Sequence, residues 1–139
     1  MNGLRAFIDT AFVQALFNRA DQHHARASQL AVRLPDADEL WTTEAVLVEI
    51  GNALSGTNRR AAVEFIEEAY QTPEVHVVSV DTEMLRRALE LYKSRSDKNW
   101  GLTDCISFLV MEARSLQDAL TSDRHFQQAG YRALLLEKE

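Results

Sequence analysis

Residues 100–111 are the most informative stretch of the chain, and they read Trp100-Gly101-Leu102-Thr103-Asp104-Cys105-Ile106-Ser107-Phe108-Leu109-Val110-Met111. From Cys105 to Met111 every residue except Ser107 is apolar, and a helix that is apolar on all sides is a buried one. Thr103 is the predicted N-cap, which places Asp104 in the first helical turn. The stretch therefore predicts a buried central helix that begins with a carboxylate.

A second acid follows this helix closely in the sequence. Residues 119–123 predict a short strand that ends in Asp123. Two acids at the ends of buried elements are hard to explain as solubilising charge, because an unpaired buried charge is costly. Asp104 and Asp123 therefore need a partner, and the best partner is a cation.

Length and composition predict one globular domain that covers residues 1–139. Hydrophobic residues make up 46% of the chain and charged residues 26%, which are ordinary values for a globular protein. No apolar run approaches the ~18 residues of a membrane span, and the N-terminus lacks the apolar core of a signal peptide. The single cysteine, Cys105, rules out an internal disulfide and suits a reducing compartment. We therefore expect a cytoplasmic protein that has no membrane partner.

The net charge of −6 argues against binding of nucleic acid through a strong overall positive field. The argument weakens if four of the 21 acids share one metal site, because the rest of the surface is then close to neutral. The polar, basic segment 93–99 lies just before the central helix. It is the best-placed basic patch for contacting a polyanion near Asp104, although a plain solvated loop is the alternative interpretation.

The order of predicted elements indicates an α/β fold. An apolar strand over 4–8 stops at Asp9, and helical spacing begins at Thr10, so Asp9 lies at a strand-to-helix junction, where a plain N-cap is the alternative role. Further along, we expect a helix over 21–34 and a final strand over 132–136. The complete pattern is β-α-α-β-α-α-β-α-α-β-α-β. It predicts a mostly parallel central sheet of four to five strands with helices on both faces.

A fourth acid lies on the predicted helix over 43–55. Val46, Ile50 and Ala53 form an apolar stripe at helical spacing, and Glu49 lies on or beside that stripe. A glutamate on a buried face is usually paired or functional. A salt bridge to an arginine is the alternative interpretation.

These acids are expected to meet at one end of the sheet, because functional sites of such folds lie at the carboxyl ends of the strands. Asp9 and Asp123 lie there directly, Asp104 opens a helix, and Glu49 lies almost two turns into another. Ligation by oxygen alone suits Mg²⁺ or Mn²⁺ rather than zinc. Such ions perform phosphoryl chemistry with an activated water, and the sequence offers no nucleophile motif or glycine-rich phosphate loop instead.

Four segments together resemble a PIN domain, and the resemblance covers the whole chain. The segments are Phe7-Ile8-Asp9-Thr10, Thr43-Glu44-Ala45-Val46-Leu47-Val48-Glu49-Ile50-Gly51-Asn52-Ala53-Leu54, Leu102-Thr103-Asp104-Cys105-Ile106-Ser107-Phe108 and Ala119-Leu120-Thr121-Ser122-Asp123-Arg124-His125-Phe126. The resemblance implies a Mg²⁺- or Mn²⁺-dependent ribonuclease with a parallel sheet. The size of the chain is most similar to the VapC type, the toxin of a toxin–antitoxin pair.

The same resemblance implies site residues and partners. By position, Asp9, Glu49, Asp104 and Asp123 would form the acidic metal-site quartet, with Asp9 and Asp104 as direct ligands. The implied partners are an RNA substrate, a cognate antitoxin protein and a second copy of the chain in a homodimer. One departure concerns Ala11, since the family often has Asn or Ser at this position, and it leaves Thr10 as the nearby hydroxyl.

Two other classes remain open at this stage. A receiver-like domain also gathers aspartates around Mg²⁺. It needs paired acids after the first strand, an acceptor aspartate near mid-chain and a late lysine, and this chain lacks that layout. The other alternative is a PIN fold with a housekeeping, RNA-binding or interaction role and little catalysis, because a fold does not fix a function.

Overall fold

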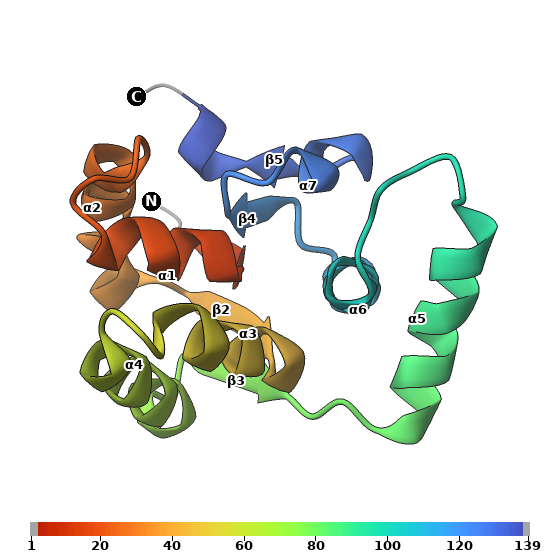
Figure 1. Ribbon diagram of the computed structural model, residues 1–139, viewed down its shortest axis with the longest axis horizontal. Coiled ribbons are helices and arrows are strands. Elements are labelled where there is room, and N and C mark those ends of the chain that lie inside the picture. The colour runs from red at the N-terminus through yellow and green to blue at the C-terminus, as the bar shows by residue number, and fades with distance from the viewer. Residues whose placement is uncertain (1–2, 138–139) are drawn as a thin grey trace.

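The computed structural model describes residues 3–137, and its centre is a parallel sheet (Figure 1). The strands are β1 (Arg5–Ile8), β2 (Glu39–Thr43), β3 (Val75–Val78), β4 (Asp118–Leu120) and β5 (Arg132–Ala133). Their order is β3-β2-β1-β4-β5, and all four pairings are parallel. The predicted α/β class with a parallel sheet of four to five strands is confirmed.

Helices cover both faces of this sheet. The helices are α1 (Thr10–Phe17), α2 (His24–Ala31), α3 (Glu44–Leu54), α4 (Arg59–Gln71), α5 (Thr82–Ser94), α6 (Leu102–Ala113) and α7 (Arg124–Gln128), with 3₁₀ turns at Leu34–Asp36 and Leu134–Leu136. Helices α1 to α4 lie on one side of the sheet, and α5 and α6 lie on the other (Figure 1). The order of strands and helices along the chain matches the predicted pattern throughout.

The strand order places a topological switch point between β1 and β4. From β1 the sheet extends through β2 and β3 in one direction, while β4 and β5 extend it in the other. Open parallel sheets bind their ligands in the crevice that forms outside the carboxyl ends of the strands at such a point. Asp9 follows β1 directly, and Thr121 follows β4 directly, so both lie at this crevice.

Aromatic packing holds α6 and α7 against this part of the sheet. The ring centroids of Phe7 and Phe126 are 6.3 Å apart, and Phe108 meets Phe126 edge-on at 5.0 Å. Phe108 lies four residues after Asp104, on the same face of α6. The contact therefore turns the Asp104 face of α6 towards α7. Cys105, the only cysteine, is fully buried in this core, as predicted.

The start of the central helix differs from the prediction. Helix α6 begins at Leu102 with Gly101 as its N-cap, so the prediction that Thr103 is the N-cap was wrong. The Asp104 carboxylate instead accepts a hydrogen bond from the Gly101 backbone N–H at 3.0 Å. A carboxylate at the third helical position can accept the backbone N–H of the N-cap residue in this way. Gly101 has no side chain, so it makes no capping hydrogen bond in return.

Three other boundaries also differ. Strand β4 ends at Leu120 rather than at Asp123, because Asp123 is the N-cap of α7 and its side chain accepts the His125 N–H. Helix α2 spans only His24–Ala31, since the Asp21 carboxylate accepts the His23 N–H and holds a turn before it. The predicted final strand is β5 followed by a 3₁₀ turn. Within residues 3–137, no helix is both long enough and apolar enough to span a membrane.

Candidate functional site

All four predicted acids line one open cavity of about 530 Å³ at the carboxyl ends of β1 and β4. Its walls come from α1, α3, α6 and α7, and it contains Asp9, Thr10, Ala11, Gln14, Glu49, Asn52, Ala53, Gly101, Asp104, Asp123 and His125. The structure therefore brings together residues that are separated by more than one hundred positions in the sequence. Ala11, where a polar residue is common in the resembling family, lines the cavity beside the amides of Gln14 and Asn52.

Asp9 is the most deeply buried acid of the cavity, with 5% of its surface exposed. It precedes α1, but its side chain makes no capping hydrogen bond there, so a plain N-cap role is wrong. Its Oδ2 accepts a hydrogen bond of 2.7 Å from the buried hydroxyl of Thr121. Burial raises the pKa of Asp9 from 3.8 to about 7, and the neighbouring charges of Asp104 and Asp123 add to the increase.

Glu49 lines the cavity from α3. The hydroxyl of Thr10 donates a hydrogen bond of 2.7 Å to Glu49 Oε1. This bond joins the start of α1 to the middle of α3. The neighbouring residue Ile50 and the preceding Val46 are buried, so the partly buried Glu49 lies beside the apolar stripe as predicted. Within residues 3–137, the side chain of Glu49 is hydrogen-bonded to Thr10 and to none of the other three acids.

Asp104 lines the cavity from the first turn of α6, with 16% of its side chain exposed. Its Oδ2 accepts the Gly101 N–H and lies 2.9 Å from Nδ1 of His125. Burial raises the pKa of Asp104 above its usual range, and the charge of Asp123 adds to this, while the two hydrogen bonds oppose it. The other oxygen of the carboxylate has no hydrogen bond within the described part of the chain.

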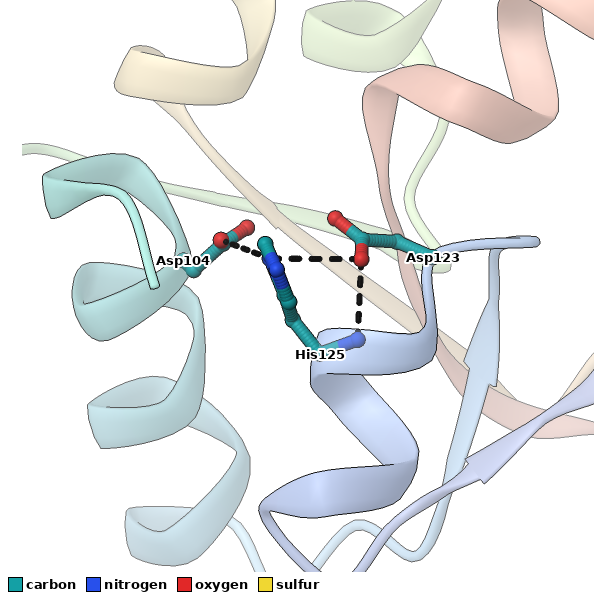
Figure 2. A group of neighbouring side chains, drawn as sticks. All are labelled: Asp104, Asp123 and His125. Carbon is teal, nitrogen blue, oxygen red and sulfur yellow. Dashed lines mark hydrogen bonds and ion pairs between the residues drawn. The ribbon is translucent and has the colours of Figure 1, made fainter. Parts of the chain in front are cut away.

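Asp123 and His125 complete the group, as Figure 2 shows. Oδ1 of Asp123 accepts the backbone N–H of His125 at 2.8 Å and lies 3.3 Å from its Nδ1. The Asp123 backbone N–H donates to the Thr121 hydroxyl, which in turn donates to Asp9. Thr121 therefore couples the positions of two of the acids.

His125 and Thr121 are the site residues that sequence reasoning missed. Both lie in the segment 119–126, which carries part of the resemblance, yet neither received a role. The signal for His125 was its position two residues after an aspartate that precedes a helix. At that spacing the backbone N–H of His125 donates to the capping carboxylate of Asp123, so the His125 side chain also lies near that carboxylate.

The charge distribution favours a bound cation. Among residues 3–137, no lysine or arginine forms a salt bridge with any of the four cavity acids, and His125 is their only potentially cationic contact. The alternative of a Glu49–arginine salt bridge is therefore wrong within this range. Asp104, Asp123 and His125 each offer one ligand atom, and these atoms all lie within 4.8 Å of one another. The donor set fits a divalent cation.

The basic segment before the central helix is partly self-neutralised. Arg95 makes two hydrogen bonds to the Asp97 carboxylate, at 3.0 and 3.1 Å, and Lys98 lies 3.9 Å from the same group. Only Lys93 and Ser94 of this segment belong to α5, and residues 95–99 form the turn and loop that follow it. The segment is followed directly in the sequence by Trp100 and by Gly101, which lines the acidic cavity.

Comparison with known proteins gives the family. The sequence model of the PIN domain matches residues 6–130, which is most of the chain. The chain belongs to the PIN domain family. The four acids that line the cavity all fall within the matched residues.

Relatives within the PIN family are VapC proteins. The chain is 30% identical over 126 residues to the "23S rRNA-specific endonuclease VapC20" of Mycobacterium tuberculosis, covering 90% of this chain and 94% of that protein. It is 27% identical over 117 residues to a "VapC ribonuclease" of Archaeoglobus fulgidus, covering 82% and 74%. The crystal structure of VapC20, described as a sarcin-ricin loop cleaving toxin, superimposes with a TM-score of 0.81 at 28% identity over 91% of this chain.

Proposed function

We propose that this protein is a divalent-metal-dependent endoribonuclease, the VapC-type toxin of a toxin–antitoxin pair. The observation that carries the proposal is the convergence of four carboxylates on one open cavity with no lysine or arginine to balance them among residues 3–137. Relatives named as endonucleases and ribonucleases support the same reaction class. We propose Mg²⁺ or Mn²⁺ as the ion, because oxygen donors dominate the cavity.

The chain's own residues have separable roles in this proposal. Asp9 and Asp104 would be direct ligands of the ion, and Asp123 would contribute from the start of α7. Thr121 and Thr10 orient Asp9 and Glu49 through hydrogen bonds of 2.7 Å each. When bound, a divalent ion supplies the positive charge that activates a water nucleophile and balances the phosphate.

We expect the purified protein to cut RNA when Mg²⁺ or Mn²⁺ is added and to leave 5′-phosphate and 3′-hydroxyl ends. No side-chain nucleophile lies among the acids of the cavity, so water is the expected nucleophile. The substrate should be total RNA that includes 23S rRNA, because a relative is named for that specificity. End-labelling of the fragments identifies the chemistry of the cut.

The control for this assay is EDTA, which should stop cleavage, with activity restored by an excess of the ion. Cleavage that persists in EDTA, or fragments that end in cyclic phosphates, would contradict the proposed mechanism. Intact RNA at all metal concentrations would favour the alternative in which the fold serves binding alone. The complete quartet of acids makes that alternative the less well supported of the two.

We further propose that a small antitoxin covers the acidic cavity, with an arginine paired to the carboxylates. A guanidinium matches carboxylates in a bidentate geometry and would replace the metal's positive charge. The exposed face of α5 offers an apolar surface for a protein partner or a second copy in a homodimer, because Leu85, Leu89 and Tyr92 lie at helical spacing and are 43–48% exposed.

Expression of this chain alone should slow bacterial growth, and co-expression with the neighbouring gene should restore it. The physical reason is that uncontrolled cleavage of RNA stops translation, and occlusion of the cavity prevents it. Growth curves and RNA integrity are measured together. Normal growth and intact RNA on solo expression would contradict the toxin assignment and favour a housekeeping role.

A further inference from the structure

We propose that His125 is a nitrogen ligand of the metal ion, which makes this a mixed oxygen and nitrogen site that prefers Mn²⁺ to Mg²⁺. The inference deepens the proposed function and rests on it for the presence of the ion. It concerns a residue outside the quartet of acids that the resemblance assigned.

The spacing of the ligand atoms supports this role. Nδ1 of His125 lies 2.9 Å from Oδ2 of Asp104 and 3.3 Å from Oδ1 of Asp123. Around an octahedral ion with bonds of about 2.1 Å, neighbouring ligand atoms are about 3 Å apart. The three atoms therefore already lie at the separations of adjacent corners of one coordination shell (Figure 2).

Two carboxylates face one imidazole nitrogen in this arrangement, and each also accepts a backbone N–H. Nδ1 of a histidine carries at most one proton, so it donates well to only one acceptor at a time. Two carboxylates nevertheless lie within 3.3 Å of it, with no lysine or arginine paired to either among residues 3–137. A divalent ion shared by the three groups satisfies the nitrogen and both carboxylates together.

The position of the imidazole is well fixed. The backbone N–H of His125 is bonded to Asp123, and the next residue, Phe126, is fully buried against Phe7 and Phe108. The imidazole is 28% exposed and reaches from α7 towards Asp104 on α6 (Figure 2). A ligand held in this way needs little reorganisation when the ion binds.

The preference for Mn²⁺ follows from the chemistry of imidazole. Mg²⁺ is bound mainly through oxygen and dehydrates reluctantly, whereas imidazole is a common ligand of transition metals. The other three histidines are not competitors for this site. Nδ1 of His24 is bonded to the Ala15 carbonyl, His76 is stacked on Trp41 at 4.3 Å, and His23 precedes α2.

The decisive experiment is pulsed electron paramagnetic resonance of the full chain loaded with Mn²⁺. Wild type should show the ¹⁴N modulation of a directly bound imidazole, and His125→Asn should lose it. His24→Asn and His76→Asn are matched controls that should keep it. Absence of the ¹⁴N signal in wild type with Mn²⁺ bound, or its persistence in His125→Asn, would overturn the inference.

A second variant tests the preference itself. His125→Asp keeps a ligand but replaces nitrogen by oxygen, so the ratio of Mn²⁺ to Mg²⁺ affinity by calorimetry should fall by about tenfold. An unchanged ratio overturns the inference, and thermal melts in EDTA establish that each variant is folded. RNA cleavage in the presence of metal but without ¹⁴N coupling would leave the proposed function intact while removing this role of His125. A ¹⁴N signal without RNA cleavage would support His125 as a ligand and contradict the proposed function.

Discussion

Asp104→Asn is expected to abolish RNA cleavage and to leave the metal-free protein at least as stable as wild type. The substitution removes one negative charge from a cavity that Asp9, Glu49 and Asp123 also line. The amide oxygen can still accept the Gly101 N–H, so the start of α6 keeps its hydrogen bond. We expect cleavage to fall by more than about 100-fold, because even outer-shell partners of metal sites cost 10–100-fold when they are replaced.

Thermal melts and cleavage assays of both proteins, with and without Mn²⁺, measure this directly. Wild type should gain about 2.7 kcal/mol at a hundredfold excess of the ion over its Kd, and the variant should gain much less. Asp118→Asn is the matched control, since Asp118 begins β4 at the other end of the sheet and pairs with Arg132 at the surface. A loss of roughly 1–3 kcal/mol in metal-free Asp104→Asn, with cleavage retained, would mean that Asp104 is only a cap.

The sequence was sufficient to predict the architecture because its elements are locally unambiguous. Apolar strands such as Phe7-Ile8 alternate with helices of clear periodicity, and parallel connections follow few topologies. The errors lie at ends of elements, where side chains compete with the backbone. Asp104 bonds back to Gly101, and Asp123 caps α7, so each moved a predicted boundary. Such competition depends on contacts that a pattern of apolar residues does not record.

The acids of the candidate site were predictable, but their arrangement was not. Each acid lies at the end of a buried element or beside an apolar stripe, and the sequence shows that placement. The coupling of Asp9 to Asp123 through Thr121 depends on the register between β1 and β4, which places Ile8 beside Leu120. The approach of His125 to Asp104 likewise depends on the packing of α6 against α7. Tertiary contacts of this kind have no signature within a single segment.

The metal-free protein is expected to lose stability as the pH rises from about 4 to about 7, and Asp9 is the cause. Its pKa is raised by burial from 3.8 to about 7 in the folded state. A carboxyl of this kind binds more protons when folded, so the free energy of unfolding falls with pH between the two pKa values. The contribution is fully present below 3.8 and is lost as the pH rises through about 7. Its magnitude is of the order of 4 kcal/mol, at 1.36 kcal/mol per pKa unit.

Asp9→Asn should remove this dependence, because an amide does not titrate and still accepts the Thr121 hydroxyl. Denaturant unfolding in EDTA between pH 5 and pH 8 should therefore show the variant gaining on wild type as the pH rises. Below pH 7, the affinity of wild type for Mn²⁺ should rise about tenfold for each unit of increase in pH, since the ion needs the ionised carboxylate. Unfolding curves that stay parallel across this range would mean that Asp9 is already ionised at pH 5.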